Sequence, residues 1–127
     1  MWENGFVHPN DLARGIACFN RGEFFASHEL LEDVWRAAPP EHKKFFQGLV
    51  QAAVAFHHHS TGNRVGMRSV MERAITNLSV PSGDLAGIKL AGLLESLAQW
   101  RNAMDKDLPP PPLPRIERVV TNPGRDH

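Results

Sequence analysis

Apolar residues recur along most of the chain at spacings of three and four positions, which is the period of an amphipathic α-helix. No stretch alternates apolar and polar positions with β-branched side chains, so we expect no sheet. Residues that start and end helices divide the pattern into five predicted helices: from about Pro9 to just before Gly22, from about Glu23 to Ala37 or Ala38, from about Glu41 to His59, from about Asn63 to Leu78, and from Ser82 or Asp84 to about Met104. Because the connections are short, neighbouring helices should pack in opposite directions. The pattern therefore predicts an all-α fold, a single-domain antiparallel helical bundle of about five helices over residues 1–106.

The composition changes after Lys106. The sequence LPPPPLPRIER cannot continue a helix, because each proline lacks a backbone donor and fixes its own φ angle. We expect residues 107–127 to form a Pro-rich extended tail of polyproline II character, frayed from Thr121 onward. Two interpretations of the tail are open. It can fold along the bundle as a strap anchored by Leu113 and Ile116, which we favour, or it can be a ligand for an aromatic groove of a partner protein.

The second predicted helix carries polar residues within its apolar face. This face is formed by Phe24, Phe25, Leu31, Val34 and Trp35. His28 lies near the middle of the face, and Glu32 follows one turn later on the same side. Glu29 and Asp33 lie away from the face and should meet water. We therefore expect His28 and Glu32 to point inward.

The third predicted helix is apolar almost all round, which indicates the central helix of the bundle. Its one polar stripe consists of Gln47, Gln51 and His58. Val54 lies beside this stripe on a helical wheel, which favours burial. Uncharged amides and an imidazole can satisfy one another inside a bundle without the cost of a buried charge. We expect the stripe to meet His28 and Glu32 in a buried polar cluster.

A His–Glu pair one turn apart has several uses, and the sequence leaves them open. The two side chains can tie helices together through hydrogen bonds, act as acid and base, or bind a divalent metal. A metal site would need His28, Glu32, His58 and water. Neighbouring positions on a helix diverge by about 100°, so at most one of His57, His58 and His59 can join the cluster, and His58 is the best placed. The HExxH zinc motif is not matched, because Glu32 stands where it requires a second histidine.

Charge and cysteine content exclude several classes of function. Lys and Arg number 14, as do Asp and Glu, so the formal net charge is zero and nothing favours nucleic acid or anionic lipid as a partner. The single cysteine, Cys18, cannot form an internal disulfide, which favours the cytoplasm. The polar, acidic first residues do not resemble a signal peptide, and the longest apolar run, Leu49 to Phe56, is too short to span a bilayer. We expect a soluble cytoplasmic protein.

Two segments, FNRGEFFASHELLEDVWR and FFQGLVQAAVAFHHHSTGNRVG, resemble the small helical family catalogued as domain of unknown function 309. The family pattern is FN-x-G with an aromatic residue, then HE-x-x-E-x-x-W, then QG-(L/I)-(V/I)-Q, then a histidine near GN. The matching positions are Phe19, Asn20, Gly22, His28, Glu29, Glu32, Trp35, Gln47, Gly48, Gln51, His58, Gly62 and Asn63. The resemblance covers roughly half the chain and implies an all-α bundle of prokaryotic origin but no activity. It adds Trp35 and Asn63 to the predicted cluster.

Three functions are open on these residues. The one we favour is a binding or scaffolding domain whose polar cluster is structural or holds a small ligand. The second is a metal-dependent hydrolase-like enzyme, with His28, Glu32 and His58 as ligands and Glu32 or a glutamine positioning water. The third is a peptide- or protein-binding helical module, including a homodimer formed through an exposed apolar patch.

Overall fold

A computed structural model describes residues 10–81 and 83–119. Over these residues the chain forms five α-helices and one short 3-10 helix: α1 (Asp11–Asn20), α2 (Phe24–Ala37), η1 (Pro40–His42), α3 (Lys43–Ser60), α4 (Arg64–Leu78) and α5 (Leu90–Asp105). The all-α bundle predicted from the sequence is confirmed. Within the described part, no helix combines the length and apolar character that a membrane crossing needs. The predicted start at Pro9, the candidate cap Ser82 and the predicted frayed end from Thr121 lie outside the described residues.

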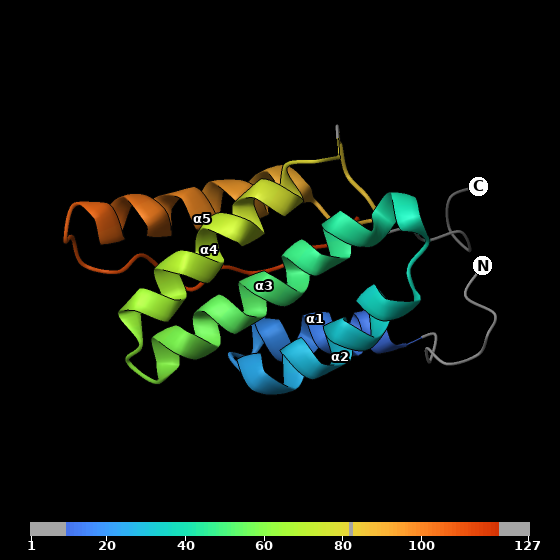
Figure 1. Cartoon of the computed structure of the whole chain (residues 1–127), viewed down its shortest axis with the longest axis horizontal. Coiled ribbons are helices and arrows are strands. Elements are labelled where there is room, and N and C mark those ends of the chain that lie inside the picture. Colours follow the sequence, from blue (N-terminus) through green and yellow to red (C-terminus); the bar gives the residue numbers. More distant parts are fainter. Residues whose placement is uncertain (1–9, 82, 120–127) are drawn as a thin grey trace.

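Helix α3 is the central helix, as its sequence predicts. It lies between α2 and α4 and packs extensively against both (Figure 1). Nine of its 18 residues are buried: Phe45, Phe46, Gly48, Leu49, Val50, Ala52, Ala53, Ala55 and Phe56. The ring of Phe56 also meets the ring of Trp100 on α5 edge-on, with centroids 5.0 Å apart. Full burial of a large apolar side chain contributes about 1.5–3 kcal/mol, so α3 supplies much of the core.

The crossing of α3 and α4 depends on a glycine. A Cβ atom added to Gly48 would lie 2.7 Å from Cγ of Leu78 and 3.1 Å from the backbone nitrogen of Leu78. Leu78 is fully buried at the end of α4, so it has little room to move. The absence of a side chain at Gly48 therefore sets how closely the two helices approach.

Helices α1 and α2 form a tight hairpin. Gly22 has a φ angle of 81°, and the amide of Glu23 donates to the carbonyl of Cys18 over 2.9 Å, which closes α1 as the sequence predicts. The hydroxyl of Ser27 on α2 is fully buried and donates to the carbonyl of Gly15 on α1 over 2.7 Å. The contact between α1 and α2 therefore includes a hydrogen bond between two small residues, Ser27 and Gly15.

Helix α5 begins later than its apolar pattern predicts. The pattern placed its start near Asp84, whereas the helix starts at Leu90. Gly87, with a φ angle of 75°, bends the chain before the helix, and Ile88 pairs with Arg118 in an isolated bridge. Ile88 is thus fully buried although it precedes the helix, so its apolar side chain gives the pattern of helical spacing without lying in a helix. The N-cap residue is Lys89 and not Asp84, although Oδ1 of Asp84 accepts from the amide of Leu90, the first residue of the helix, over 3.0 Å.

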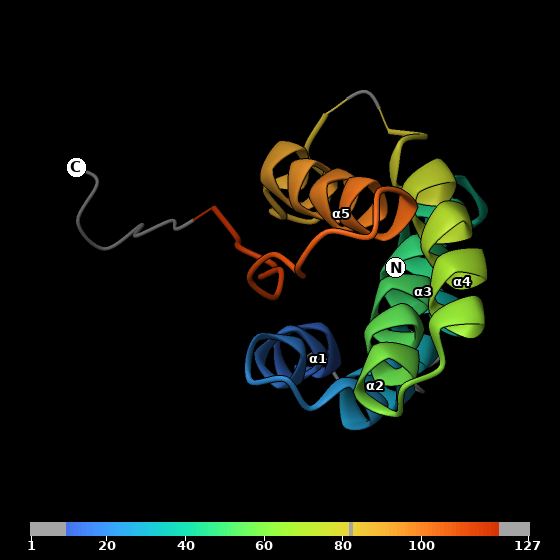
Figure 2. The ribbon, with the colours of Figure 1, turned by 90° about the vertical axis from the view of Figure 1, so that its left-hand side faces the viewer.

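Residues 107–119 form an extended strap between α1 and α5 (Figure 2). The side chain of Asn20 on α1 holds it by two hydrogen bonds: Nδ2 donates to the carbonyl of Ile116 over 3.0 Å, and Oδ1 accepts from the amide of Ile116 over 2.8 Å. On the other side, Nε1 of Trp100 donates to the carbonyl of Pro112 over 2.9 Å. Over these residues the structure supports the strap interpretation of the Pro-rich tail.

One of the two predicted strap anchors is wrong. Ile116 is buried, but Leu113 is 49% exposed, and Pro114 is buried instead. In an extended chain successive side chains point to opposite sides. Residues two apart therefore share the inward side, and the odd-numbered Leu113 points outward.

We predict that Gly48→Ala lowers the free energy of unfolding by about 1–3 kcal/mol, because the new methyl group overpacks the contact with Leu78. The matched control is Gly92→Ala on α5, where nothing lies within 4 Å of an added Cβ. This control should be neutral or stabilising by up to about 1 kcal/mol. Urea unfolding of both variants measures the difference, and equal effects would contradict the close approach of α3 and α4.

We also predict that Asn20→Ala destabilises the protein by about 1–3 kcal/mol, because it leaves the amide and carbonyl of the buried Ile116 without partners. Hydrogen exchange should increase most in residues 107–119. The control Asn102→Ala removes an exposed amide on α5 and should leave stability and strap exchange unchanged. Identical exchange of the strap in both variants would show that Asn20 does not hold it.

Candidate functional site

The predicted cluster residues form two rows on neighbouring helices. The α2 row consists of His28, Glu32 and Trp35. The α3 row consists of Gln47, Gln51, Val54 and His58. Every one of these side chains is half-buried, and the remaining predicted residue, Asn63, is exposed at the start of α4. We call the surface that the two rows form the seam face.

Contacts at both ends of α2 place helices α2 and α3 side by side. The ring centroid of Phe25 lies 5.2 Å from that of His28 and 5.4 Å from that of His57 on α3. At the opposite end, Nζ of Lys43 donates to the carbonyl of Trp35 over 2.9 Å. Helices α2 and α3 are therefore antiparallel, with His28 beside the end of α3 and Trp35 beside its beginning.

The rows lie at the surface of the bundle and not in its interior as expected. The side chain of Glu32 is 31% exposed, and its carboxylate pairs with Arg36 on its own helix at 3.4 Å. Phe25, which the wheel placed on the inward face, is 54% exposed, whereas Ser27 is fully buried. Because α2 packs against both α1 and α3, the centre of its buried side lies nearer Ser27, and the row of His28 becomes an edge.

Several cluster residues have structural partners. Oε1 of Gln51 accepts from Nδ2 of Asn77 on α4 over 2.8 Å, a bond that ties α3 to α4. Nδ1 of His58 lies 3.3 Å from Nδ2 of Asn63, whose Oδ1 accepts from the amide of Gly66 and so caps α4. Asn77 was not among the predicted cluster residues, and the signal that could have identified it is its uncharged polar side chain on the helix that follows the α3 stripe.

Other polar groups on or beside the seam face lack a hydrogen-bond partner among the described residues. These are the indole N–H of Trp35, the amide of Gln47 and the imidazole of His57. All three side chains are half-buried. Within the described residues no buried side-chain nitrogen or oxygen lacks a partner, so the polar atoms of these three side chains are open to water and available to a ligand.

The structure does not assemble the predicted metal site. In residues 10–81 and 83–119, no three His, Cys, Asp or Glu side chains are grouped so that they could hold a metal ion. Nδ1 of His28 lies 3.0 Å from the carbonyl of Phe25 in its own helix. Glu32 pairs with Arg36, and His58 lies against the start of α4. The three proposed ligands thus interact within or next to their own helices, so their polar groups do not converge.

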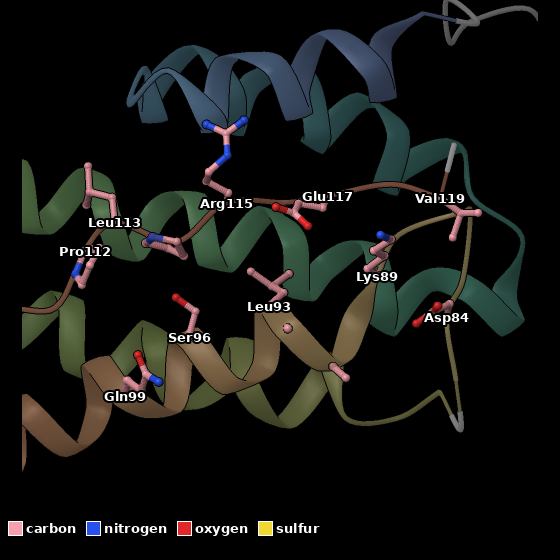
Figure 3. Close-up of a pocket in the computed structure, with 13 residues that line it drawn as sticks. Asp84, Lys89, Leu93, Ser96, Gln99, Pro112, Leu113, Arg115, Glu117 and Val119 are labelled. Atoms are coloured by element: carbon pink, nitrogen blue, oxygen red, sulfur yellow. The ribbon is translucent and has the colours of Figure 1, made fainter. Parts of the chain in front are cut away.

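A cavity of about 640 Å³ lies between α5 and the strap (Figure 3). Leu93 of α5 points toward the strap, while the guanidinium of Arg115 points away from α5 toward α1 (Figure 3). Acidic Glu117 and Asp84 and basic Lys89 all line the cavity. Groups of both signs surround it, so its charge selects neither an anion nor a cation.

Comparison with known proteins places this fold in a family. Residues 12–70 match the family described as Domain of unknown function (DUF309). Over this stretch the chain is similar to DUF309. The resemblance noted in the sequence is therefore confirmed, and the whole seam face lies within the matched residues, whereas the strap and α5 lie outside them.

Two bacterial relatives are similar to the chain. An uncharacterized protein of Aquifex aeolicus (strain VF5) is 30% identical over 93 residues, which cover 72% of this chain and 28% of the relative. The uncharacterized protein YpuF of Bacillus subtilis (strain 168) is 37% identical over 54 residues, which cover 42% of this chain and 31% of the relative. The chain thus spans less than a third of the length of either relative.

We predict a coupling free energy of about 0.5–1.5 kcal/mol between Gln51→Ala and Asn77→Ala, because each substitution alone already removes their shared hydrogen bond. A double-mutant cycle on urea unfolding measures it. The control cycle pairs Gln47→Ala with Asn77→Ala, and its coupling should be near zero because Gln47 has no described partner. Equal couplings in the two cycles would contradict the assignment of partners on the α3 row.

Proposed function

We propose that this DUF309 domain is a protein-binding module that holds a helix of another protein against the seam face. One observation carries the proposal: the indole of Trp35, the amide of Gln47 and the imidazole of His57 are half-buried but have no hydrogen-bond partner within the described residues. Their positions are fixed by the packing of α2 against α3. A partner that supplies the missing donors and acceptors would displace water from groups that are already ordered.

The shape of the seam face favours a helix as the bound element. The α3 row extends from Gln47 to His58, a length of about 16 Å at the rise of an α-helix. Its polar groups recur at spacings of one and two turns, and helix α2 runs beside it in the opposite direction. A third helix laid along two such rows can present side chains at the same spacing.

Phe25 supplies an apolar anchor at one end of the seam face. Its ring is 54% exposed and lies between the imidazoles of His28 and His57, at 5.2 and 5.4 Å. Exposed aromatic rings held in place by neighbours often dominate the binding energy of protein interfaces. We expect the partner helix to place an apolar side chain against Phe25 and polar side chains along the rest of the face.

The relatives fit this role. In both of them the similar stretch is a minor part of a longer protein, as expected for a module that works beside other segments. The hydrolase alternative needs His28, Glu32 and His58 to converge, and no described metal-binding group supports it. We place the module in the cytoplasm, which the free thiol of the buried Cys18 supports.

Site-specific photo-crosslinking tests the proposal. A benzophenone amino acid is introduced in cells at position 25 on the seam face, or at position 65, where Val65 is 82% exposed on α4. We expect a discrete crosslinked protein from position 25 that is absent from position 65. The crosslinked partner is then purified, and its binding to the uncrosslinked chain is measured by calorimetry.

Two lysine substitutions give the matched comparison. Gln47→Lys places a charge on the seam face and should weaken partner binding at least tenfold, about 1.4 kcal/mol. Gln99→Lys makes the same change at an exposed position of α5 and should leave binding unchanged. If the only crosslinked species is a second copy of this chain, or if both lysine variants bind equally well, the proposal is wrong.

A further inference from the structure

A second, smaller cavity lies at the end of the molecule where α3 turns into α4 and α5 ends. Its volume is about 290 Å³. Its apolar walls are formed by Met67, Trp100, Met104, Leu108 and Pro110. It lies apart from the seam face, and no residue of that face lines it.

The walls of this cavity suit a flexible apolar chain. Met67 is buried at 2% exposure, while Leu108 at the mouth is 51% exposed. The unbranched thioethers of Met67 and Met104 can adapt to ligands of different shape. A ligand that covers Leu108 would remove one of the exposed large apolar side chains of the chain from water, which is favourable.

At the mouth of the cavity, the guanidinium of Arg64 forms only a long ion pair among the residues that the structure describes. Nη1 of Arg64 lies 3.8 Å from Oδ1 of Asp107, and the two side chains are 69% and 91% exposed. Ion pairs between exposed groups contribute little, so a ligand anion can replace Asp107. The other acid nearby, Asp105, is already paired with Arg68. His59, whose ring meets Trp100 edge-on at 4.9 Å, adds a second polar group at the rim.

We propose that this cavity binds a small monocarboxylate with an unbranched alkyl chain. The alkyl chain would lie between the two methionines and Trp100, and the carboxylate would accept from Arg64. Ligand cavities usually measure about 300–1,000 Å³, so about 290 Å³ suits a medium chain and not a long-chain lipid. The guanidinium selects a carboxylate over an amine or an alcohol of the same length.

Methyl NMR of the full chain labelled at methionine Cε tests the proposal with octanoate as the probe. Saturable shifts are expected at Met67 and Met104. Met71, which is fully buried and does not line the cavity, is the internal reference. Octylammonium has the same chain with the opposite charge, and acetate has the same charge without the chain. Both should bind at least tenfold more weakly than octanoate.

Matched variants separate the site from general effects. Arg64→Gln should weaken octanoate about tenfold, and Arg73→Gln, an exposed arginine of the same helix away from the cavity, should not. Ala103→Leu fills part of the cavity and should abolish the shifts while the protein stays folded by circular dichroism. Equal binding of octanoate and octylammonium, equal effects of the two arginine variants, or methyl shifts that depend only on protein concentration would overturn the proposal. None of these variants lies on the seam face, so this test is independent of the proposed protein-binding function.

Discussion

Helix α3 can bury nine of its 18 residues only because α2, α4 and the ring of Trp100 each cover part of its circumference. These contacts leave a strip of the helix less covered, and Gln47, Gln51 and His58 lie along it. The side chains of this strip cannot be fully exposed to solvent, because α2 and α4 flank it. It cannot be fully dry either, because no further helix lies over Gln47 and Val54, which stay half-buried. The intermediate burial of the seam face is therefore a consequence of how the core is built.

The strap, residues 107–119, connects two helices that do not pack directly against α3 along their length. Residues 107–119 run between helices α1 and α5 (Figure 2). A proline-rich backbone suits this position. The side chains of Asn20 and Trp100 donate to strap carbonyl groups, so the strap needs few backbone N–H donors of its own. Asn20 lies within the stretch that matches DUF309, and the strap lies outside it. The side-chain amide of Asn20 holds the strap by two hydrogen bonds to Ile116. A motif residue thus links the family domain to a segment that the family match does not include.

Much of the fold could be predicted from the sequence, because Gly22, Gly62 and the prolines mark helix ends by local chemistry. The predictions failed where non-local contacts decide. Ile88 is buried in a non-helical segment whose backbone pairs with the strap, and the buried centre of α2 depends on its contact with α1 through Ser27 and Gly15. The residues of the candidate site were chosen on two helices that the structure places next to each other. The burial of the site and the positions of its candidate metal ligands were not predictable. They depend on which side of α2 faces α1 and α3, and a helical wheel of α2 alone does not define this orientation.

Solvent exchange of side-chain protons measured by NMR on the free protein tests the central claim most directly, namely that the seam face presents polar groups that the protein itself does not satisfy. The chain holds its own references, since the indole N–H of Trp100 and the amide of Asn77 have partners at 2.9 and 2.8 Å. The account predicts that the indole proton of Trp35 and the amide protons of Gln47 exchange with water much faster than these two. Equal protection of Trp35 and Trp100, and of Gln47 and Asn77, would contradict it.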